Sequence, residues 1–358
     1  MRDLLGQMLD LLPREPVALA RIVDRTGAGP RDTGAAMAIT ADERVIGSLS
    51  GGCVESAIVI TAGQVLLDGH ASTERFTGDD EFTVGLPCGG EIEVFVERLD
   101  HTDLPLLRDL HSALSAHQPV AYATTLEATP DRKLLRPGRI DPWRDLDQDA
   151  GALLAAGHNG LIGAQDCTPA AASRPRTFVQ VFRSPARMIL AGANDYTRAL
   201  SVAAAQLGYH VTVVDARETF TTPARFPAAD EVVVDWPHRY LTAENQAGRV
   251  DSRTVICVLT HDPKFDVPTL TTALHLPAVA FLGALGSRRA HTDRTRRLHE
   301  LGLTDTEISR IRSPLGLDLA AHTPEETAIS ILAQILADRG GATAQPLTAL
   351  DGPIHHRS

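Results

Sequence analysis

The chain has 358 residues, of which 43% are hydrophobic and only 4% aromatic, and its formal net charge is −11 at pH 7. This length exceeds one ordinary core and predicts two domains, whose interiors Ala, Val, Ile and Leu must fill. The negative charge argues against a nucleic-acid partner, because phosphate binding requires a surplus of Lys and Arg. It does not exclude one small anionic ligand held by a few arginines.

The beginning of the chain predicts an amphipathic helix and not a signal peptide. The inward residues of this helix are expected to be Leu4, Leu5, Met8 and Leu9. No apolar run approaches the roughly 20 residues that span a bilayer. We therefore expect a cytoplasmic protein that does not contact a membrane.

The first half of the chain is predicted to be rich in strands with one clear helix. Short apolar runs predict strands over Val17–Val23, Ala35–Thr40, Val45–Leu49, Ile92–Val96 and Phe178–Phe182. Helical spacing begins after Gly51-Gly52 and ends at Gly69. Two stretches rich in Pro, Asp, Arg and Ala are expected to be loops or insertions outside the core, Leu126–Gly151 and Ala164–Arg176.

From Arg187 onward, short apolar runs alternate with helical segments, which is typical of a parallel doubly wound sheet. The predicted strands are Met188–Leu190, Val211–Val214, Val232–Val234, Val255–Leu259 and Ala278–Leu282. A last helix is indicated by Thr323 as N-cap and Glu326 as its capping-box partner. Its inward face is expected to hold Ile329, Leu332, Ile335 and Leu336.

The fold class is thus α/β. We predict a mixed α+β domain over residues 1–185, a Rossmann-like parallel-sheet domain over residues 186–340, and a disordered tail over residues 341–358.

A nucleotide-binding pattern is present but incomplete in the second domain. Gly192 opens the turn after the first strand, and Asp215 ends the second strand, where its carboxylate could accept hydrogen bonds from ribose hydroxyls. The second and third glycine positions of the fingerprint are Asn194 and Thr197, whose side chains obstruct a pyrophosphate. An NAD(P)-dependent oxidoreductase is kept as an alternative, and a simple strand–helix turn is the favoured interpretation of Gly192.

Gly283-Ala-Leu-Gly-Ser-Arg-Arg289 follows the last predicted strand, at the edge where such sheets bind ligands. Gly286 and Ser287 could donate hydrogen bonds to a phosphate, and Arg288 or Arg289 could add charge. The alternative is that both arginines begin a solvated helix.

Two of the four cysteines lie in glycine-rich segments. Ser50-Gly-Gly-Cys-Val-Glu55 places Cys53 at a helix start, where the helix N-terminus lowers the pKa of a thiol, and Leu86-Pro-Cys-Gly-Gly90 places Cys88 in a second turn. Two such thiols could ligate a soft metal or carry sulfur, or each could be a small buried hydrophobe. Cys167 and Cys257 are expected to be structural or incidental, and all four should be free thiols.

Taken together and in order, these motifs resemble the XdhC/CoxI family over most of residues 15–340. In the first half the matching segments are Gly27-Ala-Gly-Pro-Arg31, Gly34-Ala-Ala-Met37, Gly47–Glu55 and Gly85–Gly90. In the second half they are Val211–Arg217, Leu282–Arg289, Ser313–Asp318 and Thr323–Glu326.

The resemblance implies an accessory factor, a maturation chaperone more than a catalyst, for xanthine dehydrogenase or CO dehydrogenase-type molybdenum hydroxylases. Such a factor would bind the molybdenum cofactor (molybdopterin), protect it during sulfuration by a cysteine desulfurase, and pass it to the apo-hydroxylase. Carried over by position, Cys53 and Cys88 become candidate thiolate contacts to molybdenum. The candidate cofactor contacts are Gly51, Gly52, Cys53, Glu55, Cys88, Gly89, Gly90, Gly192, Asp215, Ser287, Arg288 and Arg289.

One departure concerns the turn at Gly192. The family usually carries G-A-G-H there, whereas this chain has Gly192-Ala-Asn-Asp195, so the ligand-binding role of the turn is in question. A thiol-based sulfur-transfer protein using Cys53 as a persulfide carrier is a further alternative. A homodimer is also considered, because ligand sites commonly lie where domains meet.

Overall fold

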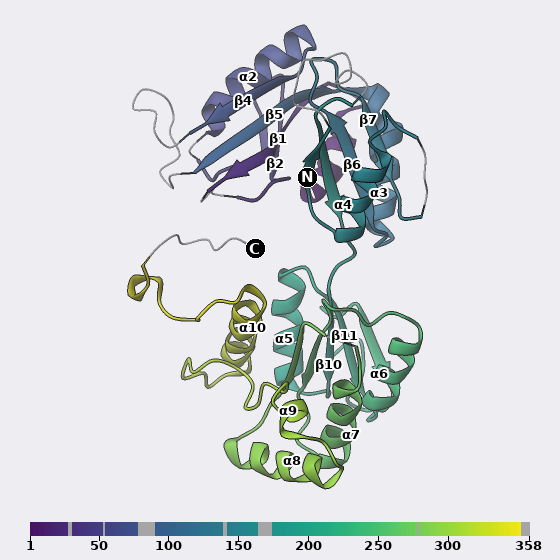
Figure 1. Cartoon of the computed structure of the whole chain (residues 1–358), viewed down its shortest axis with the longest axis vertical. Coiled ribbons are helices and arrows are strands. Elements are labelled where there is room, and N and C mark those ends of the chain that lie inside the picture. The colour runs from purple at the N-terminus through teal and green to yellow at the C-terminus, as the bar shows by residue number, and fades with distance from the viewer. Residues whose placement is uncertain are drawn as a thin grey trace. The chain divides into compact units, whose positions relative to one another are not determined.

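The computed structural model describes residues 1–27, 31–52, 54–77, 90–138, 142–163, 174–277 and 279–351. The chain divides into two compact units, of which the first covers Met1–Ser184 and the second begins at Pro185 (Figure 1).

The first unit is built around a five-stranded antiparallel sheet with the strand order β3-β2-β1-β5-β4. Its strands are β1 (Val17–Thr26), β2 (Ala36–Thr40), β3 (Val45–Gly47), β4 (Ser72–Phe76) and β5 (Glu91–Leu99). Both faces of the central strand β1 are covered, because Ala18 and Ala20 pack against α2 (Glu55–Asp68) while Val17 and Leu19 pack against α1 (Arg2–Leu11) and α3 (Leu104–Ser115). The predicted strands and the helix that ends at Gly69 are confirmed here.

A second antiparallel sheet, with the order β7-β6-β9-β8, completes this unit. It consists of β6 (Val120–Thr125), β7 (Arg132–Leu135), β8 (Gly160–Ile162) and β9 (Thr177–Phe182). One face packs against α4 (Asp147–Ala156) in a core with Trp143, Leu146 and Leu154. The expectation that residues 126–151 lie outside the core is therefore wrong. A four-residue strand and a ten-residue helix are embedded among Pro, Asp and Arg, so the local composition conceals them.

A buried ionic cluster joins the two sheets. Arg21 on β1 is fully buried, and its Nη2 donates to Glu97 Oε1 at 2.6 Å and to Thr124 Oγ1 at 2.8 Å. Arg132 on β7 donates through Nε to Glu97 Oε2, also at 2.6 Å. Because an unpaired buried charge is costly, these partners fix how the sheets face each other.

The second unit is a five-stranded parallel sheet with the order β12-β11-β10-β13-β14. Its strands are β10 (Arg187–Ala191), β11 (His210–Asp215), β12 (Glu231–Val234), β13 (Val255–Val258) and β14 (Phe281–Ala284). One face is covered by α5 (Asp195–Gln206) and α10 (Pro324–Gly340), and the other by α6 (Pro237–Gln246), α7 (Pro263–Leu274) and α8 (Arg288–Glu300) (Figure 1). The short helix α9 (Asp305–Ile308) follows α8. The strand order reverses between β10 and β13, which makes the carboxyl edge there the switch point where such sheets bind ligands.

Helix α10 begins with the predicted capping box of Thr323 and Glu326, but its inward face differs from the expected one. Ile329 is 60% exposed and Leu336 is 40% exposed. Leu332 and Ile335 are buried as predicted, and the other buried residues are Ala328, Ser330 and Ile331. The reason is that α10 packs against α5 as well as against the sheet. These contacts bury a face of the helix that is shifted by one residue from the face that apolarity alone predicts.

Beyond α10, residues 342–351 include one 3-10 turn, Leu347–Ala349. Residues 352–358 lie outside the described residues, and disorder of the tail stays a prediction.

Candidate functional site

The three glycine-rich loops of the first unit leave its large sheet at one edge. Thr26, the last residue of β1, pairs with Glu91, the first residue of β5. Gly47 at the end of β3 pairs with Met37 near the start of β2. Because neighbouring strands are antiparallel, the loops after β1 (residues 27–35), β3 (residues 48–54) and β4 (residues 77–90) all emerge there. We call this edge, with the described residues of those loops, the loop edge.

The thiols predicted at the loop edge lie outside the described residues, as do Gly89 and Cys167. The structure describes the residues on either side of Cys53, and Gly90, which is buried directly before β5 and ends the segment that carries Cys88. Proximity of the two thiols therefore stays a prediction. Cys257 lies in β13 as expected, fully buried, and burial raises the pKa of its thiol to about 12.

The loop before α2 is wrapped around the carboxylate of Glu55. From the residues that the structure describes, Oε1 and Oε2 together accept seven hydrogen bonds of 2.6 to 3.2 Å. The donors are Ser48 Oγ, Leu49 N, Ser50 N, Ser50 Oγ, Gly51 N, Gly52 N and Val54 N. Burial alone would raise the pKa of Glu55, but these donors, Ser50 foremost, outweigh it and hold the pKa well below its usual range. The anion that occupies this helix N-terminus is the protein's own side chain.

Gly51 and Gly52 present bare backbone to solvent beside that carboxylate. Their φ angles are +90° and +133°, which favour glycine, and both residues are exposed. A Cβ built on either one would meet no atom of the described residues within 4 Å. The glycines are thus required by the backbone conformation, and the space in front of them is open to a ligand.

The loop after β1 is fixed on both sides. Arg31 Nη1 donates to the Ser48 carbonyl at 2.9 Å, which ties it to the loop that precedes α2. Asn159, directly before β8, donates through Nδ2 to Thr33 O at 2.7 Å, and Gln180 on β9 donates through Nε2 to Gly34 O at 2.8 Å. Sequence reasoning missed these two amides, because lone polar residues carry no motif. Arg31 was visible only as part of the matching G-A-G-P-R segment.

Acidic and basic side chains lie together where the loop edge is formed by β1, β4 and β5. A shallow cavity of about 130 Å³ is lined by Asp24, Arg25, Thr26, Arg75, Glu91 and Glu93. Arg176 Nη2 donates to Glu93 Oε2 at 2.8 Å, and this bond holds the pKa of Glu93 below its usual range. With acids and arginines balanced, this cavity offers no surplus of positive charge to an anion.

In the second unit, the turn at the switch point is closed by side chains. A Cβ on Gly192 would lie 2.7 Å from Thr260 Cγ2, so this glycine permits close packing of the turn on the end of β13. Asn194 caps α5 by accepting from Thr197 N at 3.0 Å, and its Nδ2 donates to Leu259 O at 2.8 Å. The Asn194 side chain therefore bridges the two loops of the switch point, where a dinucleotide fold leaves room for a pyrophosphate.

Asp215 lies at the end of β11 as predicted, but its carboxylate already has partners. It is 1% exposed; Oδ2 accepts from Ala193 N at 2.8 Å and Arg217 Nη2 at 2.6 Å, and Oδ1 accepts from Arg217 N and Nε, both at 2.9 Å. Burial opposes ionisation, but the bonds from Arg217 and Ala193 hold the pKa of Asp215 below its usual range. Ribose binding by this residue stays a prediction, and it would compete with Arg217.

The predicted residues at the start of α8 lie at the same carboxyl edge. Ser287 is the N-cap and its Oγ accepts from Ala290 N at 3.2 Å. Arg288 and Arg289 are exposed in the first turn, and within the described ranges neither side chain has an ion-pair partner. A phosphate contact by these residues stays a prediction.

A buried arginine from α8, which the sequence did not single out, lines a cavity of about 150 Å³ between α7 and α8. Arg294 is 6% exposed; it donates to Asp266 Oδ2 at 3.0 Å and to Ser313 Oγ at 2.9 Å. Burial raises the pKa of Asp266 to about 6, although the Arg294 guanidinium opposes the shift.

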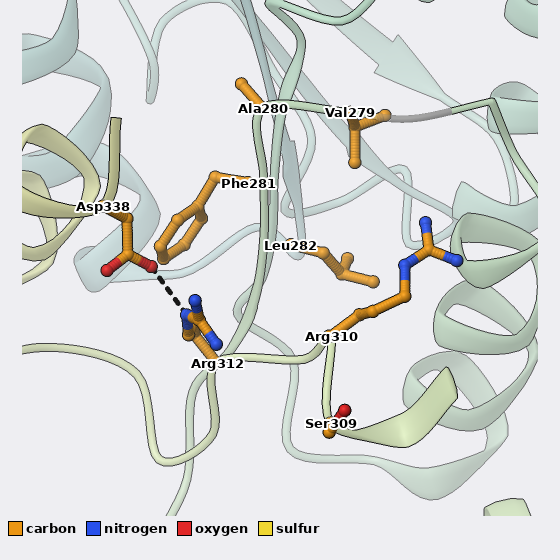
Figure 2. A pocket seen from close by; sticks show the side chains of 8 residues that line it. All are labelled: Val279, Ala280, Phe281, Leu282, Ser309, Arg310, Arg312 and Asp338. Carbon is orange, nitrogen blue, oxygen red and sulfur yellow. Dashed lines mark hydrogen bonds and ion pairs between the residues drawn. The ribbon is translucent and has the colours of Figure 1, made fainter. Parts of the chain in front are cut away.

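A larger cavity of about 350 Å³ opens along the edge strand β14, and Figure 2 shows Phe281 directed to its Asp338 side and Leu282 to its Arg310 side. Arg312 Nε donates to Asp338 Oδ2 at 2.6 Å, and Arg310 Nη1 donates to Leu274 O at 2.9 Å. None of the predicted contacts lines it, and its arginines already have partners.

Within the described residues, no group of three or more His, Cys, Asp or Glu side chains is placed to hold a metal ion. Across the same residues, no helix has the length and apolarity needed to cross a membrane.

The fold and the site define a two-unit α/β protein, with a glycine-rich loop edge in one unit and a Rossmann sheet in the other. Residues 188–335 match the family model described as the XdhC Rossmann domain, and residues 11–77 match the model of the XdhC and CoxI family. The chain belongs to the XdhC/CoxI family. The predicted resemblance is thereby confirmed, and so is the predicted α/β fold class with its Rossmann-like sheet.

Similar proteins support this assignment along nearly the whole chain. A Bacillus subtilis protein named as a probable xanthine dehydrogenase subunit is 29% identical over 93% of this chain and 96% of its own. The Escherichia coli molybdenum cofactor insertion chaperone PaoD is 28% identical over 92% of this chain and 85% of its own. A crystal structure described as a xanthine dehydrogenase from Bacillus halodurans matches 93% of this chain and 94% of that one with a TM-score of 0.67 and 24% identity, which supports the fold alone.

Proposed function

We propose that this chain binds the molybdenum cofactor at the loop edge of its first unit and supports the insertion of the cofactor into a molybdenum hydroxylase. The observation that supports the proposal is that the strands flanking three glycine-rich segments, among them those that contain Cys53 and Cys88, begin or end at one edge of the sheet. The names of the relatives from Bacillus subtilis and Escherichia coli favour the same cargo and a client of the xanthine dehydrogenase type.

The described residues of the loop edge fit an anionic cargo that carries a soft metal. Gly51 and Gly52 leave open space in front of bare backbone, and Arg31 supplies an exposed guanidinium beside the same loop. Thiolates are soft ligands that suit such a metal, so Cys53 and Cys88 are the proposed metal contacts, with Gly89 and Gly90 beside them. When bound, the cofactor supplies the metal centre that the client enzyme needs.

Glu55 has a positioning role in this proposal. Its carboxylate holds the amides of Gly51 and Gly52, so the loop has its shape before any ligand arrives. The negative charge of the cofactor would be balanced by Arg31 and by hydrogen-bond donors other than the backbone amides that Glu55 binds.

The partners follow from the same proposal. A hydroxylase client receives the cofactor, and a cysteine desulfurase sulfurates it while it is bound. In the second unit, Ser287, Arg288 and Arg289 remain proposed contacts to an anionic cofactor at the carboxyl edge, whereas the turn at Gly192 and the carboxylate of Asp215 are already engaged by neighbouring residues.

The proposal is tested by anaerobic binding of molybdenum cofactor to the full chain and to the variants Cys53→Ser, Cys88→Ser and Cys167→Ser. We expect tight retention by the wild type and by Cys167→Ser, and loss of retention by Cys53→Ser with an unchanged melting temperature. Failure of the wild type to bind, or retention by Cys53→Ser and Cys88→Ser equal to that of the wild type, would refute the assignment of the thiols to the site.

A further inference from the structure

An exposed aromatic ring with two arginines beside it lies at the carboxyl end of β11. Phe220 is 45% exposed, in a chain whose aromatic content is only 4%. The guanidinium carbon of Arg217 lies 5.1 Å from the centre of the Phe220 ring, and that of Arg225 lies 5.5 Å away. We call Phe220, Arg217 and Arg225 the Phe220 platform.

The orientation of Arg217 is fixed from several directions. Nε and Nη2 donate to the two oxygens of Asp215, and the guanidinium carbon lies 5.9 Å from the centre of the buried Phe265 ring. Its Nη1 has no hydrogen-bond partner among the residues that the structure describes, and the side chain is 43% exposed. Beside the platform, Lys264 Nζ lies 4.9 Å from the centre of the same Phe265 ring and forms an ion pair with Asp262 Oδ2 at 3.1 Å, so this pair adds no net charge.

The chemistry of this surface suits one class of ligand. Planar heterocycles stack on aromatic rings and on guanidinium planes alike, and arginine forks bind phosphate oxygens. The platform lies at the carboxyl edge of a Rossmann sheet, beside the switch point, where small ligands of this fold bind. Ring, guanidinium groups and location all point to a nucleotide.

We propose that the Phe220 platform binds a nucleoside phosphate, with the base stacked on the Phe220 ring and the phosphate held by Nη1 of Arg217 and by Arg225, whose Nη1 also donates to Phe220 O at 3.0 Å. This mode differs from that of NAD(P) in a dinucleotide fold. Asn194 bridges the switch point and Asp215 is engaged by Arg217, so neither the pyrophosphate position nor the ribose acceptor is open. The ligand is therefore a mononucleotide, and the second nucleotide of NAD⁺ should add nothing to its affinity.

This inference does not depend on the proposed function. The platform belongs to the second unit, and Cys53 and Cys88 belong to the first. Nucleotide binding and cofactor retention can thus fail separately, and each has its own variants.

The test is isothermal titration of the full chain with AMP, ADP, CMP, NAD⁺, adenosine and inorganic phosphate. We expect saturable binding of AMP and ADP, with NAD⁺ no tighter than AMP. Phe220→Ala should weaken AMP by about 10-fold or more, whereas Phe220→Tyr keeps the ring and should bind normally. Arg225→Ala should weaken AMP but not adenosine. The matched control is Leu301→Ala, which truncates another exposed apolar side chain of the same unit, 60% exposed, and should change nothing.

Three results would overturn the inference. One is the absence of saturable binding by any nucleotide up to about 10 mM. Another is AMP binding that Phe220→Ala and Arg225→Ala leave unchanged. The third is inorganic phosphate binding as tightly as AMP with no effect of Phe220→Ala, which would define a bare anion site without base recognition.

Discussion

Removal of the Glu55 carboxylate should release the loop that precedes α2. The seven hydrogen bonds that this carboxylate accepts from described residues include five from backbone amides, those of Leu49, Ser50, Gly51, Gly52 and Val54. A hydrogen bond to a charged group contributes about 1.5 to 3 kcal/mol, but exposed amides recover most of that from water. Because Gly51 and Gly52 are exposed, we expect Glu55→Ala to lower the free energy of unfolding of the first unit by about 2 to 3 kcal/mol.

The variant Glu55→Gln removes the negative charge of the side chain and keeps its size and shape. An amide oxygen in the place of Oε1 can still accept from Ser48 Oγ, Leu49 N, Ser50 N and Gly51 N. The amide nitrogen in the place of Oε2 would face two other donors, Gly52 N and Val54 N. This variant should therefore lower the free energy of unfolding of the first unit by about 1 to 2 kcal/mol, which is less than the effect of Glu55→Ala.

Urea denaturation followed by tryptophan fluorescence measures this effect in one unit at a time. The chain has two tryptophans, Trp143 in the first unit and Trp236 in the second, so a Trp236→Phe background reports on the first unit alone. Glu74→Gln is the matched control, because among the described residues Glu74 accepts only from two hydroxyls, at 3.2 and 3.5 Å. This change should lower the free energy of unfolding by less than about 0.5 kcal/mol.

The pH dependence has a defined sign. The folded-state pKa of Glu55 lies below its unfolded value of 4.5, so its contribution is complete above that pH and is lost as the pH falls through the folded-state pKa. The stability gap between wild type and Glu55→Gln should hold from pH 7 to about 5 and then shrink. Equal urea midpoints for wild type and Glu55→Ala at pH 7 would refute the claim that this carboxylate holds the loop.

Three further changes test other parts of the structure by the same denaturation assay, with the second unit observed in a Trp143→Phe background. Gly34→Ala should lower the free energy of unfolding by about 2 to 4 kcal/mol, because φ is +88° and the new Cβ would lie 2.7 Å from Asn159 Nδ2 and Gln180 Nε2. An unchanged free energy would mean that these two amides do not hold the loop after β1 in place. Glu244→Gln should cost about 2 kcal/mol at pH 7, because Arg249 and then Arg187 lower the pKa of Glu244 to about 2, and the gap should close as the pH falls from 4.5 to 2; a gap that grows on acidification would contradict this sign. Asn194→Ala should cost about 1 to 2 kcal/mol through loss of the α5 cap and the Leu259 contact, and an unchanged midpoint would argue against the closed switch point.

The regular parts of the fold were predictable because local signals determine them. The strand–helix alternation after Arg187 predicted the parallel sheet, and Thr323 with Glu326 predicted the start of α10. The inward face of α10 was only half predictable. Apolar periodicity does not reveal that the helix also packs against α5, and that contact decides which residues are buried.

The position of the candidate site could be predicted from the sequence, but the hydrogen bonds that its residues make could not. Sequence motifs selected Gly51, Gly52 and Glu55 together, but no pattern shows that a carboxylate folds back on the amides that precede it. Asp215 likewise stood where a ribose acceptor would stand, while its engagement by Arg217, two residues later, became visible only in the structure. In both cases a charged group proposed for a ligand is first satisfied by its neighbours, because a buried or half-buried charge needs partners before any ligand arrives.

This internal satisfaction has a consequence for a protein proposed to carry a cargo. Had the amides before α2 been free, they would add to the affinity for any anion and slow its release. With Glu55 in that position, the loop keeps its shape but adds little charge attraction, which leaves retention to the thiolates and to Arg31. A carrier must release what it binds, so a loop shaped by its own carboxylate suits transfer better than one that waits for the ligand's charge. Cofactor retention by Glu55→Ala should therefore fall through loss of loop shape, whereas Glu55→Gln, which keeps most of that shape, should gain no affinity from the removal of the negative charge.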